Sequence, residues 1–266
     1  GWYNTQWTEL APGEGLEGTV YRRLGKLPEG DINLLEFLAG LPPRFPLALL
    51  GTTEVASYLG IQERTLLKSL CRLSNPYKIF SLEGKECRLR LPFLQRTILS
   101  DIPRHLAERD SEILAEGLEA ISPKEGSPAT GTIANAYQRA GNDERALFHL
   151  RLASDYLDSF GAAGAAVRVQ LQRLEGLRHQ VQDEETMVQI VDAQIGLAES
   201  FQQQNLAPDA VQNYERAIPL LGALGQTKRR QQIELMVAFN KMAMGMVEDG
   251  ESIFANRLGD EEAVVE

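Results

Sequence analysis

Residues 136–156 read AYQRAGNDERALFHLRLASDY, and the pattern of small, aromatic and turn-forming residues around this stretch returns 64 positions later. Seven positions match at that single offset, and each is small, apolar or turn-forming in both copies. The pairs are Ile133 and Leu197, Ala134 and Ala198, Tyr137 and Phe201, Gly141 and Asn205, Ala146 and Ala210, Leu150 and Tyr214, and Ala153 and Ala217. A fixed internal offset of this kind is typical of a repeat architecture.

The repeated residues predict pairs of antiparallel α-helices. A small residue such as Ala134 or Ala146 allows two helices to approach closely, and a neighbouring aromatic side chain fills the groove beside them. Gly141 and Asn205 are residue types that tolerate a left-handed turn between helices. Beyond residue 129 the sequence has almost no strand signal, and its helical segments are broken near Gly141, Gly161, Asp183, Pro208 and Gly225.

The matched positions resemble the tetratricopeptide signature, which places small, aromatic and turn residues at fixed points over about 34 residues. The resemblance is good over 129–158 and fair over 192–221, with Thr130 and Gln194 where the signature has tryptophan. It implies stacked helix pairs whose concave side offers a groove to a protein or peptide partner. The polar residues expected at this groove are Asn135, Gln138, Arg139, Gln194 and Gln202, each of which also fits a plain surface position.

The N-terminal third predicts a winged helix-turn-helix domain. Residues 31–41 and 62–74 have helical apolar spacing, and a short helix between them begins near Thr52 or Thr53 and ends at Gly60. The prolines of PPRFP, residues 42–46, break the chain between the first two helices. Alternating apolar and polar residues then flank the turn at Glu83 and Gly84, which predicts a β-hairpin. Three helices followed by a hairpin wing are the order of a winged helix.

Charge is distributed unevenly along the chain, whose net charge is -10. Residues 31–106 carry ten Lys and Arg against seven Asp and Glu, whereas residues 107–266 carry fourteen against twenty-six. The candidate nucleic-acid contacts in the basic part are Arg64, Lys68, Arg72, Arg88 and Arg90. Because the acidic remainder would repel a duplex, we expect the winged helix to serve as a packing module, with DNA binding as the alternative.

Together these patterns predict a mainly α-helical, two-domain protein. We expect an N-terminal extension over 1–30, a winged-helix-like domain with a trailing helix over 31–121, tetratricopeptide-like repeats over 129–247, and an acidic tail over 248–266. Residues 122–128, SPKEGSP, form the expected linker. In the last predicted helix, Met236, Met242, Met244 and Met246 fit ordinary packing or, alternatively, a flexible docking surface.

The sequence favours neither an enzyme nor a metal or cofactor site. The three histidines are far apart, and Cys71 and Cys87 match no metal or redox spacing. The glycine-rich segment 13–19 lacks the lysine of a phosphate-binding loop. The sequence has neither a long apolar run nor a basic start followed by an apolar segment. We therefore expect a non-enzymatic cytoplasmic protein without a membrane partner.

The segment LLEFLAGLPPRFPLALLGTTEVASYLGIQERTLLKSLCRL, residues 34–73, followed by helical repeats, resembles the downstream half of STAND-class signal-transducing NTPases. The resemblance implies a regulatory winged helix and a sensor array, separate from any ATPase core. Two other interpretations remain: a transcriptional activator with a DNA-binding winged helix and a repeat effector domain, and an assembly or secretion adaptor whose winged helix is a relic.

Overall fold

The structure is a computed structural model that describes residues 26–75, 79–90, 95–96, 98–99, 102–122, 127–181 and 183–263, with side chains described as far as residue 255. Most of the predicted N-terminal extension and residues 123–126 of the predicted linker lie outside the described residues. The chain divides into two compact units. The first comprises the described parts of Gly1–Ser122 and Asn135–Asn142, and the second those of Pro123–Ala134 and Asp143–Glu266.

The first unit is a small set of helices with a three-stranded antiparallel sheet, in which β3 lies between β1 and β2. Its elements in chain order are α2 (Glu29–Ala39), β1 (Arg44–Pro46), the short 3-10 helix η2 (Leu47–Gly51), α3 (Thr53–Leu59), α4 (Glu63–Ser74), β2 (Phe80–Glu83), β3 (Glu86–Leu89) and α6 (Arg104–Ile121). The predicted helices at 31–41, 53–60 and 62–74 and the predicted hairpin are therefore confirmed, within one or two residues at each helix end.

The short helix α3 begins and ends where its sequence predicts. The Thr52 side chain accepts a hydrogen bond from the Val55 backbone N–H, and Gly60 ends the helix in the left-handed region, with φ of 59°. A hydroxyl at the start and a glycine at the end satisfy backbone groups that an α-helix leaves free at its termini. Local chemistry thus fixes the position of α3 in the chain.

The segment PPRFP differs from its prediction, because it forms a strand as well as a break. Arg44–Pro46 is the edge strand β1, and the N–H of Leu47 donates to the carbonyl of Lys85 at 2.8 Å, just beyond the strand. Proline has no N–H to donate and is tolerated at the edge of a sheet. The prolines therefore end α2 without preventing the pairing of the residues beside them.

Gly117 sets how closely α6 packs on the rest of the first unit. A Cβ atom at this position would lie 2.8 Å from side-chain atoms of Leu49 in η2 and Val55 in α3. Contacts this short are not sustained in folded proteins, so only glycine allows α6 to approach at this point. This close approach links the trailing helix to the helices before it.

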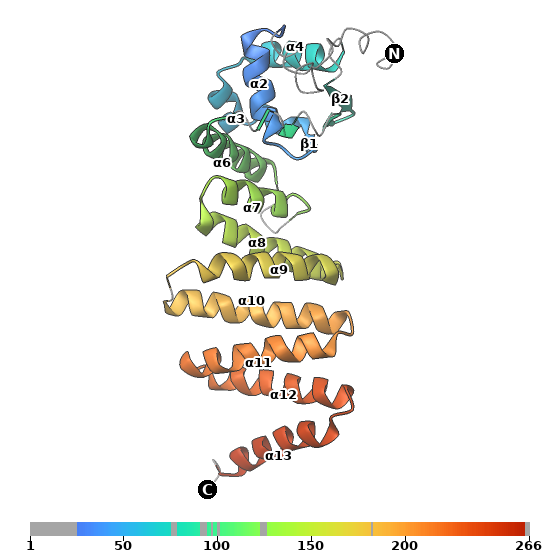
Figure 1. Ribbon diagram of the computed structural model, residues 1–266, viewed down its shortest axis with the longest axis vertical. Coiled ribbons are helices and arrows are strands. Elements are labelled where there is room, and N and C mark those ends of the chain that lie inside the picture. Colours follow the sequence, from blue (N-terminus) through green and yellow to red (C-terminus); the bar gives the residue numbers. More distant parts are fainter. Residues whose placement is uncertain are drawn as a thin grey trace, which may run out of the picture. The chain divides into compact units, whose positions relative to one another are not determined.

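The second unit is a succession of antiparallel helices, each packed on the next, from α8 to α13 (Figure 1). They are α8 (Asp143–Ser159), α9 (Ala163–Arg178), α10 (Glu184–Gln203), α11 (Ala207–Ala223), α12 (Thr227–Ala243) and α13 (Val247–Ala263), preceded by α7 (Thr130–Arg139), whose first five residues belong to this unit. The predicted mainly helical architecture is confirmed.

Five helices, α7, α8, α10, α11 and α12, end in the same way. Each is followed by a residue with positive φ, and the N–H of the next residue donates across the turn to the carbonyl five positions back, at 2.9 or 3.0 Å. The positive-φ residues are Gly141, Gly161, Asn205, Gly225 and Gly245. This is the Schellman geometry, in which a left-handed residue closes the helix. The roles predicted for Gly141 and Asn205 are thereby confirmed.

The 64-residue offset corresponds to three helices. The first and last residues of α11 lie 64 positions after those of α8, α12 begins 64 positions after α9, and α10 ends 64 positions after α7. The repeating unit therefore differs from two tandem helix pairs of about 34 residues each. The two copies differ in the first helix: α7 has 10 residues and α10 has 20, and the additional residues lie at the start of α10.

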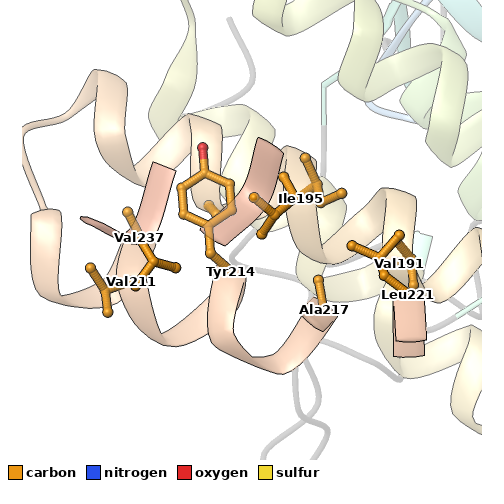
Figure 2. Packing of buried hydrophobic residues seen from close by; sticks show 10 residues of the cluster. Val191, Ile195, Val211, Tyr214, Ala217, Leu221 and Val237 are labelled. Atoms are coloured by element: carbon orange, nitrogen blue, oxygen red, sulfur yellow. The ribbon is translucent and has the colours of Figure 1, made fainter. Parts of the chain in front are cut away.

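Alanines of the repeat, together with Tyr214, form a core of the second unit. Ala198, Ala210 and Ala217 are fully buried, and Tyr214 is 1% exposed. In Figure 2 the Tyr214 ring lies between Ile195 of α10 and Val237 of α12. Small residues thus bring three helices together, as the sequence predicts, but the aromatic side chain at their centre is Tyr214, whereas Phe201, at the repeated aromatic position, is only partly buried beside this core.

The acidic tail predicted from residue 248 is instead largely helical, because α13 spans Val247–Ala263. It packs on α12, where a Cβ at Gly250 would meet the Met242 side chain and the Ala238 carbonyl. Ile253 adds a partly buried apolar contact to the core of α10, α11 and α12. The acidic residues at the start of α13 favour its dipole, so high charge here accompanies a helix.

Candidate interaction surfaces

The outward face of α4 mixes basic and apolar side chains. Arg64 and Lys68 are exposed, as the DNA-binding alternative requires. Leu67, adjacent to Lys68 in the same helix, is also 46% exposed. A helix that reads DNA usually presents polar or charged groups to base edges and phosphates. The exposed leucine is better suited to an apolar contact.

Arg72, the third basic residue predicted on α4, is held by an ion pair. Its Nε and Nη2 atoms donate to the two carboxylate oxygens of Asp31, each at 2.7 Å, and Nη2 also donates to Ser69 at 3.1 Å. Asp31 is 1% exposed, and the hydrogen bond from Arg72 is the main cause that lowers the pKa of its carboxyl group. This pair joins α2 to α4 and ties the guanidinium of Arg72 to the fold.

The hairpin places Arg88 and Arg90 on its exposed side. Arg88 in β3 stands opposite Arg44 in β1, and Arg90 follows the end of β3. Acidic residues accompany them, since Glu83 and Glu86 are partners at the turn. All the basic residues predicted as DNA contacts in the first unit are therefore exposed, but Arg72 is paired with Asp31. Carboxylates and a leucine lie among the others.

The five residues predicted for a partner groove divide between the two units. Asn135, Gln138 and Arg139 belong to the first unit and are exposed. Gln194 and Gln202 lie on α10 in the second unit, where both are half-buried. Gln202 accepts a hydrogen bond from the Tyr214 hydroxyl at 3.2 Å, and this contact supports the core.

A cluster of charged residues connects four helices of the second unit, and we call it the polar cluster. Hydrogen bonds, an ion pair and mutual electrostatic effects link its members. It consists of Arg151, Asp155 and Asp158 on α8, Arg173 on α9, Asp192 and Glu199 on α10, and Arg229 on α12. Sequence reasoning missed this cluster, although the spacing of its three α8 members places them on one side of a helix.

Two serines hold Asp158 at one end of the polar cluster. The Ser200 hydroxyl donates to one carboxylate oxygen at 3.2 Å, and the Ser154 hydroxyl donates to the other at 3.3 Å. Burial nevertheless raises the pKa of Asp158. The pKa of Glu199 is also raised, first by desolvation and then by the negative charge of Asp158. This end of the cluster is therefore rich in hydrogen-bond acceptors.

Asp192 and Arg229 form the ion pair of the cluster. Arg229 Nη2 donates to the Asp192 carboxylate at 2.5 Å, which joins α10 to α12. Both side chains are about one-third exposed, so solvent screens the attraction and its contribution to stability is small. Its effect is to orient the Asp192 carboxylate toward α12.

Arg173 and Gln170, one turn apart on α9, are each 3% exposed. Gln170 Nε2 donates to the Ser154 hydroxyl at 2.6 Å, and a Cβ on Gly196 of α10 would collide with this amide. Within the described residues, neither Gln170 Oε1 nor Arg173 Nε has a hydrogen-bond partner. The pKa of Arg173 is lowered, mainly because burial disfavours its charged form. The positive charge of Arg151 lowers this pKa further, and the carboxylates of Asp192 and Asp155 partly offset the effect.

The methionines of α12 and the following turn separate into two groups. Met236 and Met244 pack against the core, as expected for ordinary packing residues. Met242 and Met246 are 38% and 44% exposed, and they continue a line of exposed apolar side chains that includes Leu235 and Phe239. The packing interpretation therefore holds for Met236 and Met244, and a docking role for Met242 and Met246 stays a prediction.

Among the described residues, no group of three or more His, Cys, Asp and Glu side chains is arranged to hold a metal ion. The same part of the chain contains no helix with the length and apolar character needed to cross a membrane. The two cysteines are unpaired thiols: Cys71 is exposed, whereas burial raises the pKa of Cys87 to about 11.

Comparisons with known proteins give likenesses in structure but not in sequence. No protein-family model matches the chain, and no curated protein sequence matches it. The chain is similar to a solved structure, a Signal Transduction ATPase with Numerous Domains (STAND) protein with a tetratricopeptide repeat sensor from Pyrococcus horikoshii, at 10% identity and a TM-score of 0.25. The likeness covers 97% of this chain and 60% of that one, so this chain spans less than two thirds of its length. At this TM-score the likeness does not establish a shared fold.

Proposed function

We propose that the chain is a non-enzymatic regulatory module that binds another protein through its helical array. The observation that carries this proposal is the polar cluster. Its Arg151, Asp155 and Glu199 are exposed, and its Arg173 is buried with an Nε that has no hydrogen-bond partner among the described residues. Charges that the fold does not use are available to an incoming chain. A stack of helices offers such a chain an extended surface.

We further propose that the first unit is a winged helix, and that the whole is the winged-helix and sensor-repeat part of a STAND-type ATPase or a transcription regulator. The element order of helix, strand, two helices and a hairpin supports the winged helix. So does the sheet order, in which the hairpin strand β3 pairs with β1. The resemblance of residues 34–73 to STAND proteins supports the regulatory role.

The surface of the first unit favours protein packing over DNA binding. Arg72 is engaged by Asp31, which leaves Arg64 and Lys68 as the exposed cations of α4 beside the exposed Leu67. Few phosphate contacts give weak binding at physiological salt. We therefore assign the basic face a packing role, with DNA binding as the alternative function.

Partner capture with two charge-altered forms of the full chain tests the proposal. One form carries Asp155→Lys and Glu199→Lys, two exposed residues of the polar cluster, and the other carries Arg64→Glu and Lys68→Glu on α4. We expect the first form to lose the proteins that the wild-type chain retains and the second to keep them. Loss on α4 alone would assign the partner to the first unit.

Binding to duplex DNA tests the alternative function separately. Fluorescence anisotropy with a labelled duplex at about 50 mM and 200 mM salt would show a steep salt-dependent loss if the basic residues contact phosphates. We expect no binding at either concentration. Salt-sensitive binding that Arg64→Glu with Lys68→Glu abolishes would favour a DNA-binding transcriptional activator.

A further inference from the structure

One side of α12 carries a line of exposed apolar side chains, which we call the apolar stripe. It consists of Leu235, Phe239 and Met242, with Met246 in the turn that follows the helix. Phe239, in the middle of the line, is 58% exposed. The residues are spaced by four, three and four positions, which aligns side chains along one side of a helix. Adjoining apolar side chains on a surface mark an interaction site, whereas single ones are common on any protein.

The other sides of α12 are covered by its neighbours in the array. Ile233 and Val237 are buried in the core that α12 shares with α10 and α11. On a second side α13 approaches so closely that a Cβ at Gly250 would meet the Ala238 carbonyl and the Met242 side chain. Among the described residues, the apolar stripe is therefore the part of α12 that its neighbours leave accessible. Its alternating spacing of four and three is that of the seam between two paired helices, so a helix is the expected occupant.

The segment that carries the apolar stripe is electrically neutral within an acidic chain. Residues 227–251 contain four basic residues, Lys228, Arg229, Arg230 and Lys241, and four acidic residues, Glu234, Glu248, Asp249 and Glu251. Residues 107–266 as a whole carry fourteen basic residues against twenty-six acidic ones. Two copies of a chain with a net charge of -10 repel each other over most of their surfaces. The neutral segment lacks this repulsion, so two copies can approach each other there.

Opposite charges stand at the two ends of the apolar stripe. Lys228, in the first turn of α12, is exposed and precedes Leu235 by seven positions, which places it on the same side of the helix. Glu248 and Asp249, in the first turn of α13, are exposed beyond the other end. If two copies pair with their α12 helices antiparallel, the basic end of each meets the acidic end of the other. A two-fold axis forms both contacts at once.

We propose that the apolar stripe is a self-association surface, on which a second copy of this chain binds with the two α12 helices antiparallel. Phe239 and Met242 of both copies form the centre of the interface, and the charged pairs form its two ends. The inference goes beyond the proposed function, because no residue of the stripe belongs to the polar cluster. A contact made mainly by one helix from each copy is smaller than a standard protein interface, so the dimer is weak, with a Kd of about 10 to 100 μM.

Sedimentation equilibrium of the full chain, from about 5 to 500 μM, tests the surface. We expect a monomer–dimer equilibrium whose Kd Phe239→Glu raises by about tenfold or more, since each dimer contains the substitution twice. Phe160→Glu is the matched control, because Phe160 is 73% exposed in the same unit but lies outside the stripe, and its Kd should equal that of the wild type. Circular dichroism should show both variants folded. A chain that stays monomeric at about 500 μM, or equal effects of the two substitutions, would overturn the proposal.

Charge reversal tests the antiparallel arrangement in the same experiment. Lys228→Glu should raise the Kd of the dimer by about threefold to tenfold, and the addition of Glu248→Lys should restore most of the affinity. In a parallel pair, Lys228 would face Lys228 of the second copy, and Lys228→Glu would exchange one like-charge pair for another. An unchanged Kd for Lys228→Glu therefore contradicts the antiparallel dimer. The form with Asp155→Lys and Glu199→Lys should dimerise as the wild type does, so failure of the proposed function and failure of this inference are distinguishable.

Discussion

The two units differ in whether a buried charged side chain has a hydrogen-bonded partner of opposite charge. In the first unit, Asp31 is matched by the two nitrogens of Arg72, and the pair holds α2 on α4. In the second unit, Arg173 is buried among carboxylates that bond elsewhere or not at all. A satisfied charge contributes to the fold, whereas an unsatisfied one costs stability and persists where function requires it. The contrast supports the proposal that the helical array, rather than the first unit, binds the partner.

The largest expected loss of stability comes from removing the Tyr214 side chain from the core of the second unit. Tyr214→Ala removes a side chain that is 1% exposed and lies between α10, α11 and α12. We expect a loss of about 3 to 5 kcal/mol in the free energy of unfolding, because the small neighbouring residues cannot close the cavity. Urea unfolding followed by circular dichroism measures it.

A matched tyrosine in the same unit serves as the control. Tyr156 on α8 is half-buried and contacts Phe160 at the exposed end of the helix. Tyr156→Ala should cost about 1 kcal/mol, a typical value for a partly exposed side chain. If the two substitutions had equal effects, Tyr214 would not be the centre of the core formed by α10, α11 and α12.

The second-largest expected loss of stability comes from removing one partner of the Asp31–Arg72 ion pair in the first unit. Asp31→Asn removes the charge that Arg72 binds, and we expect a loss of about 2 kcal/mol, less than for a fully buried pair because Arg72 is 43% exposed. Since the folded-state pKa of Asp31 is lowered, its stabilisation is complete above pH 3.8 and disappears as pH falls through the folded pKa. The deficit of Asp31→Asn should therefore vanish in strong acid.

Arg72→Lys tests whether the geometry of the pair matters. Lysine keeps the charge but cannot donate two parallel hydrogen bonds to Asp31. Its cost in unfolding free energy should be smaller than that of Asp31→Asn. A larger cost would mean that the stem of Arg72, rather than its pairing with Asp31, stabilises α4.

The sequence predicts most of the fold because the deciding signals are local. Thr52 and Gly60 delimit α3, and Gly141 and Asn205 turn the chain, each through backbone geometry that its own side chain dictates. The strand at Arg44–Pro46 was missed because its pairing with β3 joins residues about forty positions apart. The helix beyond residue 247 was missed because charge masked its few apolar contacts.

The polar cluster could not be predicted in the same way. Ser154, Gln170 and Ser200 are brought together from three helices, and nothing in their local sequence indicates that they meet. Asn135, Gln138 and Arg139 were selected from a family resemblance, which implies a groove but does not identify its charges. Arg72 was named as a candidate DNA contact because the sequence cannot show that Asp31, 41 residues earlier, would bind it.

A smaller effect tests the turns that separate the helices. Gly225 has a φ of 65° with open space around it, so Gly225→Ala meets no collision and costs only the backbone strain, about 1 kcal/mol. Asn205 occupies the preceding turn, between α10 and α11, at a φ of 59°, and Asn205→Gly should be neutral or stabilising by about 0.5 kcal/mol. Urea midpoints of the two variants should thus shift in opposite directions, or only the first should shift.

The smallest expected effect is on Asp158, where removal of the charge should stabilise the fold, whereas removal of the charge of Asp31 should destabilise it. Burial raises the pKa of Asp158, so its ionised form weakens the fold, and stability falls as pH rises from 3.8 through the folded pKa. Asp158→Asn keeps an oxygen for the serine hydroxyls but carries no charge, and at pH 7 it should gain about 0.5 kcal/mol or less. That gain should disappear in acid, as should the loss for Asp31→Asn. Urea unfolding at neutral and acidic pH measures both, and a loss for Asp158→Asn at pH 7 would mean that the polar cluster, like the pair in the first unit, is built for stability.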